Sequence, residues 1–458
     1  MNGRDWAAQE LATIDLGDER LNARAEVLLS CLGDKPQVSI PAACNGWAET
    51  KAAYRFFDNE DVTPQAILEP HFEATRQRIA GADVVLCIED TSEIDYTTKG
   101  DIEGLGPLNY EARHGLYLHP MIAVTPDRLC HGLLSYQSVI REQGSLGAKP
   151  DPHRPIEEKE SIRWRNGYEQ ASSLQQDCPE TDFVYVADRE ADFFELLAAA
   201  DATDATPKAG FVIRSQHDRT LDNKKTLRAT LARAPVLGEV SFDIPATDKR
   251  KARTVVQQLR VKRVTVKAPA HLKGETSVEV TAVYAVERNP PKGQDPITWL
   301  LLTSEQVMTE QDAATIVQWY LCRWQIEIFF RILKSGCKIE ELQLQHVDRI
   351  EVALALYCII AWRVLWLTTL GRSCPEMSCD AVFETDEWQS AYIVKNRQAP
   401  PDTPPDLSTM IATIASFGGF LGRKSDGFPG PQSLWIGLQR VRDFAEVIAA
   451  QRAINDSS

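Results

Sequence analysis

The sequence lacks the cysteine and histidine spacing that a structural metal cage requires. None of its ten cysteines forms a CxxC pair, and the closest two are Cys374 and Cys379. The eight histidines are scattered, and none lies near a cysteine pair. This spacing excludes a zinc cage of cysteine and histidine ligands. We expect free thiols in a reducing cytosol.

Targeting and membrane segments are also scarce. The N-terminus has no apolar stretch of the kind found in secretory signals, so a cytoplasmic protein is expected. One apolar run, Val352 to Leu370, has about the length that spans a bilayer. Arg363 lies inside it, and a charge near mid-bilayer costs at least about 2.5–3.5 kcal/mol. We therefore interpret the run as a buried helix behind a large sheet and expect no membrane partner.

The chain has no overall excess of positive charge. Its net charge of −15 would by itself argue against nucleic acid as a partner. The stretch from Ala209 to Lys267, here called the basic block, reverses this sign. It holds 14 Lys or Arg against 5 Asp or Glu, so its net charge is 14 − 5 = +9 and the rest of the chain carries −24. Such a block is typical of a DNA-binding surface, and a solvated basic hairpin is the alternative.

Length and pattern predict an α/β protein with helical ends. A chain of 458 residues with 43% apolar residues has room for two or three domains. We expect a helical domain at 1–70, an α/β domain at 71–372 with a β-rich insertion at about 218–298, and a helical domain at 373–458.

Two further segments refine this organisation. A single long helix is expected from about Ala313 to Ser335. Residues 375–408 are rich in Pro, Asp and Ser, and we interpret them as a loop or linker.

Two predicted buried strands end in aspartate. The runs DVVLCIED and DFVYVADRE are short and apolar, and they end at Asp90 and Asp188. The carboxyl ends of strands are where open α/β folds place their sites. The alternative is that each aspartate starts a turn or caps the next helix.

The predicted long helix carries a stripe of polar side chains. Tyr320, Arg323, Glu327 and Lys334 are separated by 3, 4 and 7 residues, so they share one helical face. Two aspartates and a glutamate can hold two divalent cations, and oxygen ligands alone suit Mg²⁺ or Mn²⁺. The alternative is a solvated salt bridge between Arg323 and Glu327.

At this point the sequence resembles a known family. The motifs are similar to those of bacterial cut-and-paste transposases of the DDE superfamily, in the branch with the Tyr-Arg-Glu-Lys (YREK) signature. The resemblance extends over nearly the whole chain. Its motifs are IEDTS at 88–92, VADREAD at 186–192, Y-x2-R-x3-E-x6-K at 320–334, NPPKG and WLLLT within 289–303, and FGGFLGRKSDG at 417–427.

The resemblance implies a fold and a reaction. The fold would be a ribonuclease-H-like core with Asp90 on the first strand, Asp188 on the fourth and Glu327 on a later helix. These three acids would be the catalytic metal ligands, with Mg²⁺ as cofactor and Mn²⁺ as a substitute. The β-rich insertion would fill the gap between Asp188 and Glu327. The C-terminal helices would pair two subunits, and the element would leave its donor DNA through a hairpin.

The resemblance also implies contacts with double-stranded DNA, both the element's ends and the target. Tyr320, Arg323 and Lys334 would hold phosphates. Trp299 would stack a flipped base, with a core position as the alternative, and Trp324 would help to distort the DNA end.

Basic residues outside this stripe are further candidates for DNA contacts. Arg214 belongs to the basic block, and Arg20 and Arg24 lie in LGDERLNAR, which resembles the family's end-recognition segment.

Two other functions remain as alternatives. A catalytically silent DNA-binding regulator derived from a transposase predicts a damaged triad, whereas all three acids are present. A metal-independent hydrolase using paired carboxylates leaves the basic block without a role.

Overall fold

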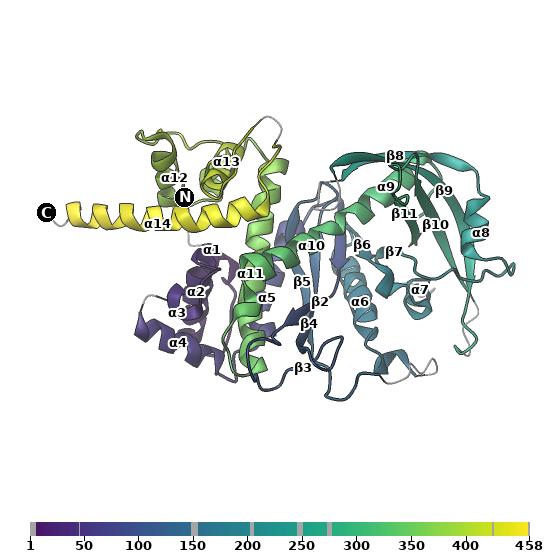
Figure 1. Cartoon of the computed structure of the whole chain (residues 1–458), viewed down its shortest axis with the longest axis horizontal. Helices are drawn as coiled ribbons and strands as arrows, with labels where there is room; N and C mark the ends of the chain where they lie inside the picture. Colours follow the sequence, from purple (N-terminus) through teal and green to yellow (C-terminus); the bar gives the residue numbers. More distant parts are fainter. Residues whose placement is uncertain are drawn as a thin grey trace.

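The protein combines one large mixed sheet with helical segments at both ends of the chain (Figure 1). The computed structural model describes residues 6–44, 46–147, 154–201, 206–244, 251–272, 277–423 and 426–456. Lys249 and Arg250 of the basic block lie outside these residues.

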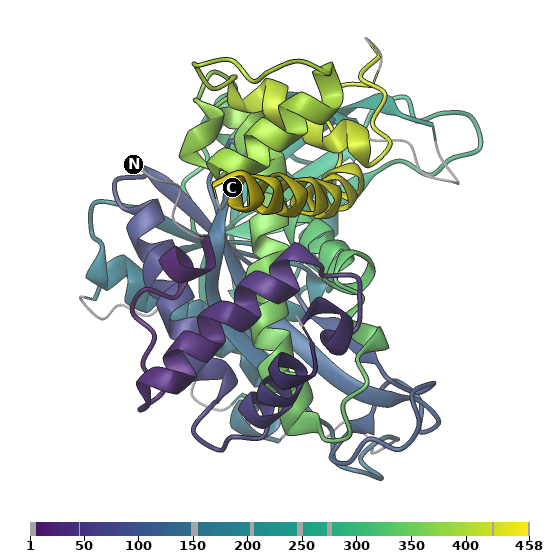
Figure 2. The same cartoon turned by 90° about the vertical axis from the view of Figure 1, so that its left-hand side faces the viewer.

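The described N-terminal part is helical. It consists of α1 (Trp6–Glu10), α2 (Glu19–Asp34), α3 (Ile40–Ala43), α4 (Trp47–Phe57) and α5 (Pro64–Ile79). The Thr63–Pro64 pair starts α5, because the Thr63 side chain accepts a hydrogen bond from the Ala66 N–H and Pro64 opens the helix. Helices α2, α4 and α5 pack against the long helix α11 (Val347–Ser373), as Figure 2 shows.

Five strands form the central part of the sheet. They are β1 (Val84–Glu89), β4 (His114–Val124), β5 (Cys130–Val139), β6 (Asp182–Ala187) and β7 (Gly210–Arg214). β4 is antiparallel to both β1 and β5, whereas β6 is parallel to both β1 and β7. The short strands β2 (Ser92–Asp95) and β3 (Gly106–Pro107) also pair with β4. Most of these strands are apolar along their length because helices cover both faces of the sheet.

The strands of the 218–298 region extend this same sheet. β8 (Val236–Ile244), β9 (Arg253–Lys267) and β10 (Ser277–Glu287) form an antiparallel ladder. β11 (Thr298–Thr303) joins the ladder to β7, so the sheet continues without a break. The short helix α8 (Leu227–Ala232) packs on this extension.

Different helices cover the two faces of the sheet. One face packs against α9 (Glu310–Cys322), α10 (Trp324–Arg331) and α11. The other face packs against α6 (Ile162–Asp177), α7 (Phe194–Asp201) and α8.

The helix α11 is the one described helix long and apolar enough to cross a membrane by length and composition. It is 89% buried over its most apolar window, so it forms a core layer of this fold.

The C-terminal part is more helical than the sequence predicted. Its helices are α12 (Thr385–Asn396), α13 (Leu407–Phe417) and α14 (Pro431–Asp456), and α14 projects away from the sheet in Figure 1. The prediction of a loop or linker at 375–408 is wrong where α12 forms. A reciprocal capping box between Glu384 and Glu387 starts this helix, and the buried Trp388 anchors it.

Candidate functional site

Strand register brings two of the predicted acids together. Asp90 directly follows β1, and Asp188 directly follows β6. The two strands are parallel, with Ile88 opposite Val186. The same register, continued by two residues, sets Asp90 beside Asp188.

The alternation of side chains decides which face the acids share. Ile88 and Val186 pack into the core beneath α9, α10 and α11, whereas Cys87 and Tyr185 pack into the core beneath α6. Because side chains alternate along a strand, Asp90 and Asp188 continue on the α9–α10 side. This side carries Glu327, which lies on α10.

The helix that carries Glu327 is interrupted. α9 ends at Cys322 and α10 begins at Trp324, so the helix expected from about Ala313 to Ser335 forms with a local break at Arg323. At the junction the Arg323 N–H donates to the Tyr320 carbonyl, and the Arg323 carbonyl accepts from the Ile326 N–H. These i to i+3 bonds tighten one turn, and a π-helical turn follows at Ile332–Gly336.

Arg323 joins two of the three acids. Its Nη1 donates to Asp90 Oδ2 at 2.7 Å, and its Nη2 donates to Glu327 Oε1. The Arg323 side chain is 10% exposed and the Glu327 side chain 53% exposed. The i,i+4 salt bridge of the alternative interpretation therefore exists, but its arginine is buried and also reaches the strand end.

The acid cluster is short of positive charge. Burial raises the pKa of Asp90 to about 6, and the carboxylates of Asp188 and Glu327 add to the rise, although Arg323 opposes it. A carboxyl held in this state gains from any additional cation that approaches it.

The carboxylate oxygens of the three acids suit a hard divalent cation, but the three side chains do not surround a single metal position. Among the described residues, no three His, Cys, Asp or Glu side chains are grouped closely enough to hold a metal ion. The Arg323 guanidinium instead lies against both Asp90 and Glu327. Asp90, Asp188 and Glu327 provide oxygen ligands alone, which suits Mg²⁺ or Mn²⁺ once that guanidinium moves away.

Tyr320 lies beside this acid cluster, and Trp299 packs against Tyr320. Trp299 is 6% exposed, stacks on Phe242 at 5.3 Å and meets the Tyr320 ring edge-on at 5.4 Å. Burial raises the pKa of Tyr320, and Arg323 and Arg214 oppose the rise. Arg214 ends β7, so it approaches the cluster from the sheet. Trp299 thus packs in the core.

The remaining predicted residues of the helix lie further along it. Trp324 is partly buried against the core at the first position of α10. Lys334 lies in the π-helical turn, with its Nζ 3.5 Å from Glu340 Oε1. At this distance the ion pair with Glu340 is weak.

Part of the basic block has a structural role. Arg219 pairs with the buried Asp192 at 2.6 Å, and Arg253 pairs with the buried Glu287. The net charge of the basic block is therefore larger than the positive charge that it presents on its exposed surface. Its exposed cations among the described residues are Lys224, Lys225, Arg228, Arg233, Lys251, Lys262, Arg263 and Lys267.

The N-terminal arginines each have a carboxylate partner. Arg20 pairs with Asp18, the cap of α2, at 2.6 Å. Arg24 pairs with Glu49 and so ties α2 to α4.

Sequence reasoning noted Lys51 and Arg55 as cations of the N-terminal helices but missed Trp47, which shares a face with them; we define these three residues as the α4 outer face. All three are exposed at four-residue spacing, and Trp47 is 80% exposed. The signal was a tryptophan in step with two cations, on a helix whose other face buries Phe56 and Phe57.

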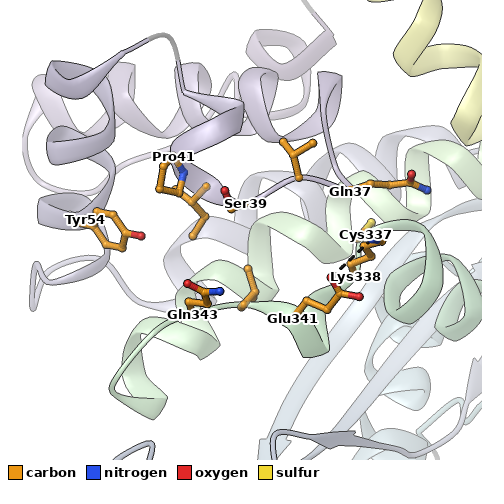
Figure 3. A pocket seen from close by; sticks show the side chains of 11 residues that line it. Gln37, Ser39, Pro41, Tyr54, Cys337, Lys338, Glu341 and Gln343 are labelled. Atoms are coloured by element: carbon orange, nitrogen blue, oxygen red, sulfur yellow. Dashed lines mark ion pairs between the residues drawn. The ribbon is translucent and has the colours of Figure 1, made fainter. Parts of the chain in front are cut away.

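A hollow of about 180 Å³ separates the N-terminal helices from the segment after the π turn (Figure 3). Gln37, Ser39 and Tyr54 approach from the helical side, and Lys338 and Gln343 approach from the other side. None of the three acids lines it, so this hollow is separate from the cluster.

Comparison with known proteins gives three family matches. A model described as transposase DNA-binding matches residues 3–62, a transposase DDE domain matches 197–363, and a transposase Tn5 dimerisation domain matches 359–458. Glu327 lies within the DDE match, whereas Asp90 and Asp188 precede it.

A solved structure, the cryo-EM structure of a piggyBac transposase synaptic complex with hairpin DNA, shows 11% identity. The match covers 81% of this chain and 72% of that chain, with a TM-score of 0.37, which is too low to assign a fold.

Proposed function

The chain belongs to the DDE transposases of the insertion-sequence type, and we propose that it cleaves and joins DNA strands at the ends of its element with Asp90, Asp188 and Glu327. Cut-and-paste movement through a hairpin is part of this proposal. The observation that carries it is the convergence of the three acids. Strand register sets the two aspartates side by side, and Arg323 joins one of them to Glu327.

The acids would hold the metal, and the cations would hold the DNA. Bound Mg²⁺, or Mn²⁺ in its place, would activate the attacking water or 3′-hydroxyl and stabilise the leaving oxygen. Arg323 would exchange its carboxylate partners for a DNA phosphate, which frees Asp90 and Glu327 to act as ligands. Lys334 and Arg214 would hold neighbouring phosphates, and Tyr320 would pack beneath Arg323.

The topology supports a ribonuclease-H-like core. Of the five central strands, β1 is the first in chain order and β6 is the fourth. Asp90 and Asp188 follow these two strands, and Glu327 follows on a later helix, which is the placement that the family resemblance implies. The strands β8, β9 and β10 would then be the inserted part of the core.

We further propose the α4 outer face as a surface that contacts double-stranded DNA at the element's ends. The DNA-binding family match covers this helix, and its two cations provide charge complementarity in an otherwise acidic chain. Arg20 and Arg24 would contribute less, because each already has a carboxylate partner. The match to a dimerisation domain supports a homodimer formed through the C-terminal helices.

The test is cleavage of DNA that carries the inverted repeats flanking the reading frame. Incubation with Mg²⁺ or Mn²⁺ should give nicked, hairpinned and rejoined products, and EDTA should abolish them. Stable end binding without any metal-dependent cleavage would favour the silent regulator instead. Cleavage that persists in EDTA would favour the metal-independent hydrolase.

A further inference from the structure

A buried chain of polar side chains lies directly behind Asp90. Glu89, the residue before it, is fully buried on the opposite face of the sheet. The Tyr185 hydroxyl on β6 donates to Glu89 Oε2 and lies 3.1 Å from the Trp164 carbonyl. Helix α6 approaches so closely that a Cβ at Gly167 would fall 2.1 Å from Glu89 Oε2, so only glycine leaves room for this carboxylate.

His119 on β4 continues the chain back towards Asp90. Its Nε2 lies 3.2 Å from Glu89 Oε1, and its Nδ1 lies 2.8 Å from Thr91 Oγ1. Among the described residues neither His119 Nε2 nor Glu89 Oε1 has a hydrogen-bond partner, so these two atoms interact as a short electrostatic contact; a proton on Nε2 would face the carboxylate and leave Nδ1 to accept from the Thr91 hydroxyl. The Thr91 N–H in turn donates to Asp90 Oδ1 at 2.8 Å.

The register of the sheet accounts for this geometry. β1 and β2 pair with β4 in one continuous register, with Glu89 opposite Met121 and Ser92 opposite Leu118. Asp90 and Thr91 form the break between the two strands, and the register sets Thr91 opposite His119. Asp90 therefore lies where the β-ladder with β4 is interrupted. Neighbouring side chains, rather than ladder hydrogen bonds, then determine the orientation of its carboxylate.

Burying these polar groups lowers the stability of the fold, so a functional role is the better explanation of their presence. Fully burying a carboxylate and an imidazole costs free energy that apolar residues in the same places would avoid. Its members Glu89, His119 and Tyr185 come from β1, β4 and β6, and Asp90 and Asp188 directly follow the first and the last of these strands. Its terminal contact is the threonine that holds the Asp90 carboxylate.

We propose that Glu89 and His119 are positioning residues that act through Thr91 to hold the Asp90 carboxylate in its metal-binding orientation. This inference rests on the proposed function, because it assigns a role towards the same carboxylate. The Thr91 hydroxyl is the link, since it is the group through which His119 reaches the turn. The pair contacts neither DNA nor metal.

The test compares Thr91→Val with Thr91→Ser in the full-length protein bound to element-end DNA. Valine keeps the volume and removes the hydroxyl, whereas serine keeps the hydroxyl. Free Mn²⁺ would be measured by electron paramagnetic resonance during titration, beside the Mn²⁺ dependence of nicking. We expect Thr91→Val to weaken Mn²⁺ binding and raise half-saturation by about 5- to 10-fold. Thr91→Ser should remain close to the wild type.

Further measurements separate positioning from simple destabilisation. End binding and melting temperature should be nearly equal in the two Thr91 variants. Glu89→Gln, which retains shape, should shift Mn²⁺ binding in the same direction as Thr91→Val.

Two outcomes would overturn the inference: unchanged Mn²⁺ binding in both Thr91→Val and Glu89→Gln, or a serine variant as impaired as the valine variant. A wild type that binds ends but never cleaves with metal would instead refute the proposed function.

Discussion

Removal of Arg323 should steepen the pH dependence of the stability of the metal-free protein and extend it to higher pH. In the wild type the guanidinium lies against Asp90 and Glu327, and it limits the rise in the pKa of Asp90. In Arg323→Ala the acids lose this cation, so the pKa of Asp90 should rise above its present value of about 6. The variant should therefore be less stable than the wild type near neutral pH.

The sign follows from proton binding. A folded-state pKa above the ordinary 3.8 means that the folded chain holds this proton more tightly than the unfolded chain. The ionised Asp90 therefore lowers stability as the pH rises from about 4 through 6, by roughly 3 kcal/mol in the wild type. In Arg323→Ala the loss should continue to higher pH.

The magnitude follows from the exposure of the partners. Breaking a buried ion pair costs about 3–5 kcal/mol. Because Glu327 is half exposed, we expect about 2–3 kcal/mol from Arg323→Ala at pH 7.5, or roughly 2–5 °C in melting temperature for a chain of this length. At pH 5 the Asp90 carboxyl is largely protonated, and most of this difference should disappear.

The assay is thermal unfolding in EDTA at pH 5 and pH 7.5. Arg331→Ala is the matched control, because it removes an exposed arginine from the same helix and should change little at either pH. Mn²⁺ at pH 7.5 should then stabilise Arg323→Ala more than the wild type, since no guanidinium competes for the acids. An equal loss of stability at both pH values, or no loss at pH 7.5, would refute the reasoning.

Other changes separate chemistry from binding. Asp90→Ala, Asp188→Ala and Glu327→Ala should each abolish cleavage but leave gel-shift binding to element ends largely intact; substantial metal-dependent cleavage by any of them would contradict the triad. Trp47→Ala should weaken end binding by about 5- to 30-fold without changing the melting temperature, and unchanged affinity would remove the α4 outer face from the interface. Trp299→Ala should cost about 3–5 kcal/mol because the indole is buried. Trp299→Phe should slow hairpin formation more than the first nick in time courses, and equal slowing would leave Trp299 as a core residue.

The strands and their acids were predictable because the signals are local. A short apolar run ending in an acid describes β1 and β6 well, since each strand is buried and its last residue is followed by a turn. Their side-by-side placement was not local. It depends on the parallel pairing of segments almost a hundred positions apart, for which only the family resemblance gave a basis.

The details of the Glu327 helix were beyond the sequence for a related reason. Spacing correctly predicts that Arg323 and Glu327 are neighbours on a helix. It contains nothing about Asp90, which is 233 positions away, or about the tightened turn at Arg323. The same holds for Trp299, whose burial depends on Phe242 from another strand.

The position of Arg323 couples the two ligands that the function requires. Its guanidinium neutralises carboxylates in the free chain, and the proposed function gives it a phosphate partner in the complex. When Arg323 binds a DNA phosphate, it would leave Asp90 and Glu327 without their cation, which favours metal binding. Metal binding to these acids would in turn release Arg323 for DNA. Because linkage is reciprocal, element-end DNA should raise Mn²⁺ affinity by the same factor by which Mn²⁺ raises DNA affinity. In Arg323→Ala both factors should fall towards one, and an undiminished coupling in that variant would show that the exchange does not occur.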